Sequence, residues 1–168
     1  MFKINTKKIA VIAIFMALGV VLKFFSIGSG EFRISVWEIP MFLIGILVGP
    51  FYGGVCALGA DLIYGLAFSP YPFSIIMMFT TVVWGVAGGL FYKKDIDKLN
   101  LVVTILMTSL LATGINTIYL VSYYGLESAL AMLPIRVAIS LVKTPVTSII
   151  VLVLINEFKR LKVDKLID

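Results

Sequence analysis

The sequence predicts an all-α integral membrane protein, a bundle of six transmembrane helices with both the N- and C-termini on the cytoplasmic side. Three observations lead to this fold class. Of the 168 residues, 61% are apolar and only 14% are charged, which leaves too few polar residues to cover the surface of a soluble domain. Six apolar segments follow one another along the chain. Most of the cations lie at those breaks that a six-span topology places on one side of the membrane.

The six candidate helices can be justified in chain order. They span Ile9 to Ile27, Trp37 to Gly49, Phe51 to Phe68, Phe73 to Tyr92, Leu101 to Tyr124 and Leu130 to Phe158. The first follows a basic start, as the apolar part of a signal peptide would, but it has no obvious A-x-A cleavage site, so we expect a retained span. The second is too short to cross about 30 Å alone, and the Gly49-Pro50 pair separates it from the third. With no repeat or linker, residues 1–168 are expected to form a single membrane-embedded domain.

The positively charged residues determine the predicted orientation. If the N-terminus is inside, ten of the fourteen lysines and arginines lie on the cytoplasmic side. They are Lys3, Lys7, Lys8, Lys93, Lys94, Lys98, Lys159, Arg160, Lys162 and Lys165. Because the cations border apolar segments, we attribute the net charge of +5 to topology and the lipid bilayer, not to nucleic-acid binding. The first outer loop, residues 26–36, alternates apolar and polar residues and is expected to form an extended lid.

Several kinds of chemistry are disfavoured by residues that the sequence lacks. Cys56 is the only cysteine and there is no histidine, which removes disulfides, thiolate clusters, histidine metal sites and histidine-based triads. An intramembrane aspartyl enzyme needs two carboxylates, but only Asp61 is clearly inside a span. The sequence also has no G-x-x-x-x-G-K-[ST] loop for ATP. We therefore expect a protein that is not an enzyme and that has no catalytic residue, metal or cofactor.

The last helix carries a polar stripe in an otherwise apolar segment. At about 100° per residue, its polar side chains fall within an arc of roughly 60°. They are Arg136, Ser140, Lys143 and Thr147. A charged residue at mid-bilayer costs about 2.5–3.5 kcal/mol, so such residues normally face the bundle interior or a wet cavity. Two interpretations follow, an internal salt bridge with Asp61 as the acidic partner, or a site that receives an anionic ligand.

The two preceding helices offer groups that suit a heteroaromatic ring. In the fifth, polar residues recur at helical spacing, namely Thr113, Asn116, Tyr119 and Tyr123. An amide and two phenols supply hydrogen-bonding groups beside flat aromatic faces. The fourth presents a largely apolar face that includes Phe73 and Trp84. The alternative for both helices is ordinary helix packing, with polar side chains joining the helices.

The first helix contains small residues one turn apart. Ala13 and Ala17 lie in the stretch AIFMA, with Ala10 and Gly19 nearby. Small side chains at this spacing let another helix approach closely. The pattern therefore predicts a docking face, either for a partner protein or for another helix of the same bundle.

These motifs resemble a known family. FRISVWEIPMFLIGILVGPFYGGVCALGADLIYG, and INTIYLVSYYG followed by LPIRVAISLVKTPV, are similar to the folate-specific branch of the substrate-binding S components of energy-coupling factor (ECF) vitamin transporters. The resemblance covers the whole length. AIFMA matches the family's Ala-x-x-x-Ala motif, which in relatives packs against the transmembrane coupling subunit. At the start of the fourth helix the sequence departs from that branch, with YPFSI where a Pro-Gly-Phe-Thr type is usual.

The resemblance implies a function and a set of site residues. The chain is expected to capture a vitamin, folate or a reduced folate, in the plasma membrane of a prokaryotic cell, with a coupling subunit and two ATPase subunits as partners. The pterin or similar ring of the vitamin is expected to bind among Trp84, Asn116, Tyr119 and Tyr123. The carboxylates of its glutamate tail are expected to meet Arg33, Arg136 or Lys143. Asp61 is expected either to bind nitrogen atoms of that ring or to pair with one of these cationic side chains. The alternatives are another vitamin (riboflavin, pantothenate, pyridoxamine or cobalamin), or a small-solute carrier that works alone.

Overall fold

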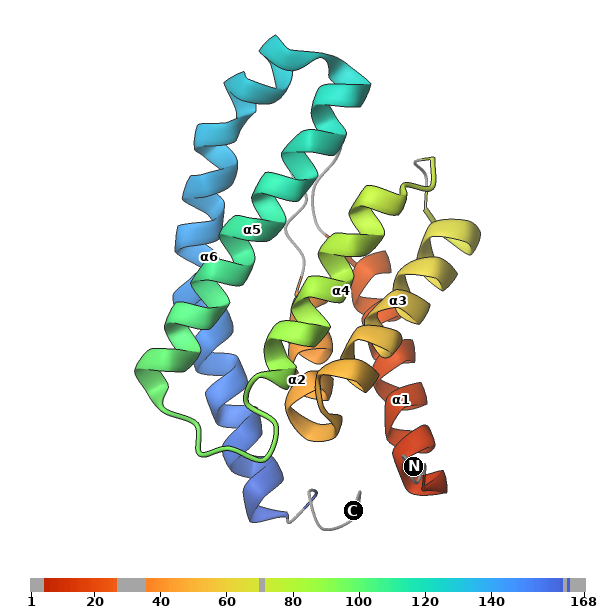
Figure 1. Ribbon diagram of the computed structural model, residues 1–168, viewed down its shortest axis with the longest axis vertical. Coiled ribbons are helices and arrows are strands. Elements are labelled where there is room, and N and C mark those ends of the chain that lie inside the picture. The colour runs from red at the N-terminus through yellow and green to blue at the C-terminus, as the bar shows by residue number, and fades with distance from the viewer. Residues whose placement is uncertain (1–4, 27–35, 70–71, 162, 164–168) are drawn as a thin grey trace.

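The computed structural model describes residues 5–26, 36–69, 72–161 and 163, and it consists of six helices in this part of the chain (Figure 1). They are α1 (Thr6–Phe24), α2 (Glu38–Val48), α3 (Pro50–Ala67), α4 (Ile75–Gly89), α5 (Lys98–Tyr124) and α6 (Leu126–Arg160). The described residues contain no strand. The prediction of six helices is confirmed, and their ends lie within a few residues of the expected ones.

Local sequence explains where several helices begin. The side chains of Asn5, Ser74 and Asp97 accept hydrogen bonds from backbone N–H groups in the first turns of α1, α4 and α5. Two glycines make one-residue connections, Gly49 (φ 97°) between α2 and α3 and Gly125 (φ 85°) between α5 and α6. Such positive φ angles favour glycine because it has no Cβ. Consecutive helices therefore turn back on each other without a loop.

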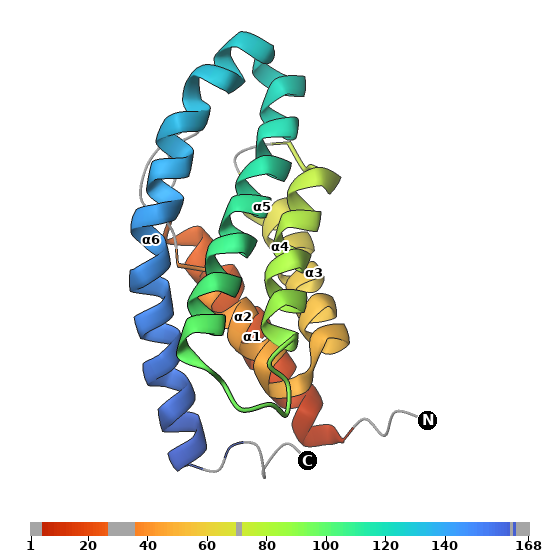
Figure 2. The same ribbon diagram turned by 60° about the vertical axis from the view of Figure 1, so that its left-hand side comes forward.

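The short helix α2 lies inside the bundle. Nine of its 11 residues are buried, and it contacts α1, α3, α4 and α6 (Figure 2). Met41, Phe42 and Ile44 have no exposed surface. The prediction that this segment cannot cross a bilayer alone agrees with its position, because other helices surround it on most sides.

Glycines bring α2, α3 and α4 into backbone contact. A Cβ added to Gly88 would overlap the carbonyl oxygen of Phe42, and one added to Gly85 would overlap the carbonyl oxygen of Gly53. Gly45 and Gly89 are equally confined. In a membrane, where lipid is as apolar as leucine, close backbone packing of this kind is a main source of helix association. These contacts join the three helices into one unit.

Helices α5 and α6 form a long antiparallel pair. Thr113 of α5 and Ser140 of α6 share a hydrogen bond of 2.9 Å across the interface. Further hydroxyls on α6, those of Thr144 and Ser148, donate to carbonyl oxygens one turn back in their own helix. These polar side chains are therefore satisfied without water, although they lie in an apolar part of the molecule.

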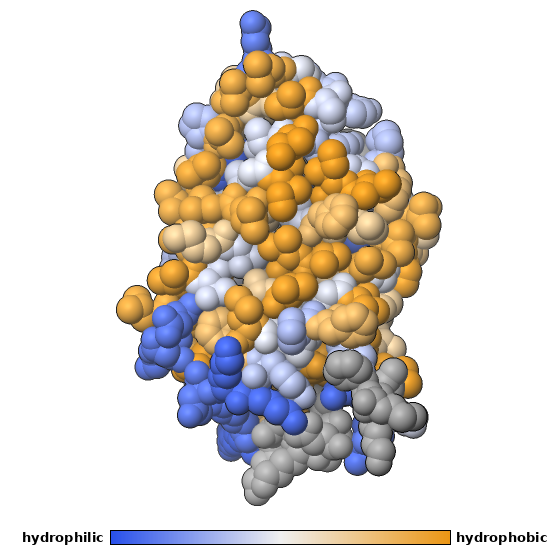
Figure 3. Space-filling model, viewed as in Figure 1, coloured by the Kyte–Doolittle hydropathy of each residue, from blue (hydrophilic) through white to orange (hydrophobic). Residues whose placement is uncertain are grey.

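The surface is divided by polarity. Apolar side chains cover most of the face in Figure 3, and exposed cations gather at its lower end, where α1 begins and α6 ends. The exposed cations at this end come from the start of α1, the α4–α5 connection with the first residue of α5, and the end of α6. They are Lys7, Lys93, Lys94, Lys98, Lys159 and Arg160. Two helices, Lys98–Tyr124 and Leu126–Arg160, are long and apolar enough to cross a membrane. This distribution is typical of a bundle surrounded by lipid, with one basic end.

Candidate functional site

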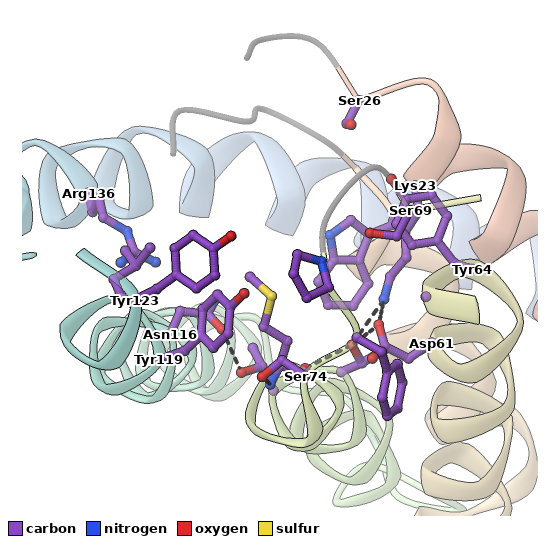
Figure 4. Close-up of a pocket in the computed structure, with 18 of the residues that line it drawn as sticks. Lys23, Ser26, Asp61, Tyr64, Ser69, Ser74, Asn116, Tyr119, Tyr123 and Arg136 are labelled. Atoms are coloured by element: carbon purple, nitrogen blue, oxygen red, sulfur yellow. Dashed lines mark hydrogen bonds and ion pairs between the residues drawn. The ribbon is translucent and has the colours of Figure 1, made fainter. Parts of the chain in front are cut away.

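A cavity of about 260 Å³ lies in the half of the bundle opposite the basic end (Figure 4). Helices α1, α3, α4, α5 and α6 all contribute to its wall. Six of the nine predicted binding residues line it, namely Asp61, Phe73, Asn116, Tyr119, Tyr123 and Arg136. Its size is near the lower end of the range for small-molecule sites. The structure thus brings together most of the residues that helical spacing indicated.

One wall of the cavity is aromatic. The rings of Tyr119 and Tyr123 are stacked with centroids 6.0 Å apart and an angle of 24° between their planes. Phe73 and Met77 also line the cavity, from the start of α4 and the residues before it. A flat ring that enters this space can therefore stack on a phenol face and contact a thioether, both of which favour aromatic ligands.

An amide group lies on the floor between α4 and α5. The Oδ1 of Asn116 accepts a hydrogen bond of 2.9 Å from the hydroxyl of Thr80. This contact orients the side chain, and it leaves the amide N–H groups of Asn116 without a partner among the described residues. A carbonyl or ring nitrogen of a ligand is a suitable acceptor for them.

Arg136 lies at one end of the cavity. Its Nη1 donates to the hydroxyl of Thr117 at 3.4 Å, a contact that joins α6 to α5. The guanidinium group is planar and remains charged, so it can bind a carboxylate through two parallel hydrogen bonds. Among the described residues that line the cavity, Arg136 and Lys23 are the cations.

A buried ion pair lies at the other end of the cavity. Lys23, in the last turn of α1, pairs with Asp61 of α3. Its ammonium group also donates to the hydroxyl of Thr81 at 3.1 Å and lies 4.3 Å from the centre of the Trp37 ring. Asp61 is therefore paired, as one interpretation expected, but its partner is Lys23 and not a cation of α6.

Sequence reasoning did not identify Lys23. A lysine near the end of an apolar segment is usually a residue that extends to the lipid head groups. The sequence contains one signal that this end of α1 faces a polar space. Two polar residues, Lys23 and Ser26, stand close together just before the first outer loop. The same reasoning missed Trp37 and Tyr64, which also line the cavity.

Of the other three predicted binding residues, the structure describes two, and both lie away from the cavity wall. Lys143 pairs with the buried Glu38 at the start of α2 and lines a separate, apolar groove beside α6. Trp84 is 5% exposed and packs edge-to-face on Phe42, in the core. Arg33 and most of the predicted lid lie outside the described residues.

The fold and the cavity define a class of protein, an all-helical membrane protein with an internal site for a small molecule. A family model described as "ECF transporter, substrate-specific component" matches residues 7–155. The chain therefore belongs to this family and is an S component of an ECF transporter, a multi-pass membrane protein.

Relatives agree with this assignment. The chain is 28% identical over 152 residues to the folate transporter FolT of Leuconostoc mesenteroides, covering 86% of this chain and 82% of the relative. It is similar to a crystal structure of FolT bound with folic acid, with a TM-score of 0.78 and 26% identity over 86% of this chain and 88% of the other. The structure of the S component of a bacterial ECF transporter shares the fold, with a TM-score of 0.69 at 19% identity over 92% of this chain and 96% of the other.

Proposed function

We propose that this S component binds folate or a reduced folate in the cavity and delivers it for import. The observation that carries the proposal is the combination of a stacked tyrosine pair with Arg136 in one cavity. An aromatic face suits the ring system of a folate, and a guanidinium group suits the carboxylates of its glutamate tail. The similarity to a folate transporter and, separately, to a crystal structure of FolT bound with folic acid supports the same ligand class.

The remaining steps of transport belong to partners. We propose that the chain works in the plasma membrane of a prokaryotic cell with a transmembrane coupling subunit and two ATPase subunits. The exposed side of α1 supports such a contact, because Ala13 and Ala17 lie one turn apart on the surface beside Ile14. We further propose that both termini are cytoplasmic, which the basic end of the bundle supports; in this orientation the cavity would lie in the outer half of the membrane.

The proposed function predicts that Arg136→Gln weakens folic acid binding by about 10- to 100-fold. A hydrogen bond to a charged group contributes about 1.5–3 kcal/mol, and glutamine keeps a polar side chain but is shorter and has no charge. The dissociation constant of the purified protein in detergent can be measured by isothermal titration calorimetry.

A matched control is Arg160→Gln. Arg160 is also on α6, but it lies at the basic end, where its side chain is 78% exposed and forms an i,i+3 ion pair with Glu157. We expect unchanged affinity in this variant. If folic acid does not bind to the native protein, and riboflavin, pantothenate, pyridoxamine or cobalamin does, the ligand class is wrong and the family assignment stands.

Lys143 offers a second prediction, on stability. Because its side chain pairs with Glu38, whose side chain is 4% exposed, Lys143→Met leaves a buried carboxylate without its cation. We expect a loss of up to about 3 kcal/mol in the free energy of unfolding and little change in folic acid affinity. The double variant Glu38→Gln with Lys143→Met should recover part of the loss. If Lys143→Met keeps its unfolding temperature but binds folic acid tenfold more weakly, Lys143 takes part in ligand binding, as the sequence predicted.

A further inference from the structure

The ion pair of Lys23 and Asp61 has an acceptor that the protein does not use. Both side chains line the cavity and are mostly buried, with 8% and 11% of their surface exposed. The Oδ1 of Asp61 accepts from Lys23 and from the hydroxyl of Thr81, the latter at 3.0 Å. Among the described residues, no group donates to Oδ2. A buried carboxylate oxygen at a cavity wall is therefore available to a ligand donor.

A purely structural role explains this pair poorly. Removing two charges from water is costly, and apolar residues of similar volume usually stabilise a bundle as well or better. Charged residues inside a membrane bundle more often mark a substrate site. Residues of other segments support the pair. The hydroxyl of Thr81 in α4 donates to Asp61, and the ring of Trp37, just before α2, lies beside the ammonium group of Lys23. Such support fixes the orientation of the two charges, as a recognition site requires.

The charges present a defined pattern to a ligand. An acceptor oxygen of Asp61 lies next to the positive charge of Lys23, so the complementary edge has an N–H group next to a carbonyl oxygen. The ring of folic acid carries this edge at N3–H and O4, followed by an amino group at position 2. We propose, on the basis of the proposed function, that the Lys23–Asp61 pair recognises this N–H and carbonyl edge and selects 4-oxo over 4-amino rings.

The two ends of the cavity differ in charge, because one holds the cation Arg136 and the other holds the ion pair of Lys23 and Asp61. Figure 4 shows Arg136 on one side and the Lys23–Asp61 pair on the other, with Tyr119 and Tyr123 on the side of Arg136. A ligand with hydrogen-bond donors at one end and carboxylates at the other is complementary to both ends. The reverse orientation would place carboxylates beside an ion pair in which the negative charge of Asp61 offsets the positive charge of Lys23, so they would gain less than beside Arg136.

The test compares folic acid with its 4-amino analogue, which differs only at this edge. In the analogue, an amino group replaces O4 beside Lys23, and N3 becomes an acceptor that faces Asp61. We expect the native protein to bind folic acid about tenfold more tightly or better, because both contacts become repulsive. In Lys23→Gln and in Asp61→Asn the ratio of the two dissociation constants should fall toward one, because each variant removes one of the two contacts. Arg136→Gln should instead weaken both ligands by the same factor and keep the ratio.

Each outcome of this comparison decides the proposal. A native protein that binds both ligands equally tightly overturns it, and so do variants that weaken both ligands equally and keep the ratio. If either single variant does not fold, the double variant Lys23→Gln with Asp61→Asn removes both charges together and gives the ratio. Failure of the native protein to bind folic acid is a separate result, since it removes the proposed function itself.

Discussion

Gly88→Ala is expected to destabilise the bundle by about 3 kcal/mol, because the added methyl group has no space. Its Cβ would overlap the carbonyl oxygen of Phe42 and lie 2.7 Å from the carbonyl carbon. These are backbone atoms, which no change of rotamer can move, so α2 and α4 must separate to accommodate the methyl group. The loss can be measured as a lower unfolding temperature of the purified protein in detergent.

Gly114→Ala is the matched control for this substitution. Gly114 lies in the middle of α5, and a Cβ at this position would meet no atom within 4 Å other than the adjacent residues and backbone of its own helix. Alanine should therefore raise the stability slightly, by about 0.5–1 kcal/mol, because it has the higher helix propensity. If the two substitutions had the same effect, the close packing of α2 and α4 would not contribute to stability.

Replacing Ala13 and Ala17 together with leucine is expected to abolish folate uptake while leaving folic acid binding unchanged. The two residues are exposed on α1, and neither lines the cavity. Two leucines would keep the helix but hold the backbone of a partner helix several ångströms away, which removes close packing along the contact. Uptake by cells and co-purification with the coupling subunit measure assembly, and calorimetry of the isolated chain measures binding.

Gly114→Leu provides the control for this double variant. It adds an equally large side chain at an exposed position, on α5 instead of α1. We expect normal uptake from it. Uptake that persists in the Ala13 and Ala17 variant would place the partner contact elsewhere, and uptake in cells that contain only this chain would favour a carrier that works alone.

The helices were predictable because the lipid bilayer restricts which structures a membrane-spanning segment can form. A segment surrounded by lipid must satisfy its backbone groups within itself, so a long apolar segment predicts a helix and breaks such as Gly49-Pro50 mark its ends. The stripe on α5 was predictable for the same reason, since Asn116, Tyr119 and Tyr123 lie on one face of a regular helix. All three line the cavity.

The stripe on α6 shows where helical spacing becomes insufficient. Arg136 and Lys143 share one face, as the sequence indicates, but seven residues separate them by about 10 Å along the helix axis. Over that distance the neighbouring helix changes. Arg136 faces the cavity and contacts α5, whereas Lys143 reaches Glu38 of α2. Angular position alone does not identify the neighbour of a side chain.

The ion-pair partners could not be assigned from the sequence because they depend on tertiary contacts. Lys23 and Asp61 are 38 positions apart, and Lys143 is more than 100 positions from Glu38. Lys23 and Glu38 both flank the first outer loop, where charged residues are usually solvated. Only the packing of α1 on α3 and of α2 on α6 turns them into buried partners.

The limited contact between α6 and the other helices has a mechanical consequence for the cavity. In the described part of the chain, the backbone of α6 lies close to α5 and α2, and its Phe158 makes one edge-to-face ring contact with Phe15 of α1. The backbone of α5 lies close to α6 and α4, whereas glycines hold α2, α3 and α4 together. The helices thus form two groups, α1 to α4 and the pair α5 and α6, and residues of both groups line the cavity. A small rotation of the α5 and α6 pair against the other four helices would widen or narrow the cavity without changing the structure of any helix. A bound ligand that contacts both groups of helices would restrain this rotation.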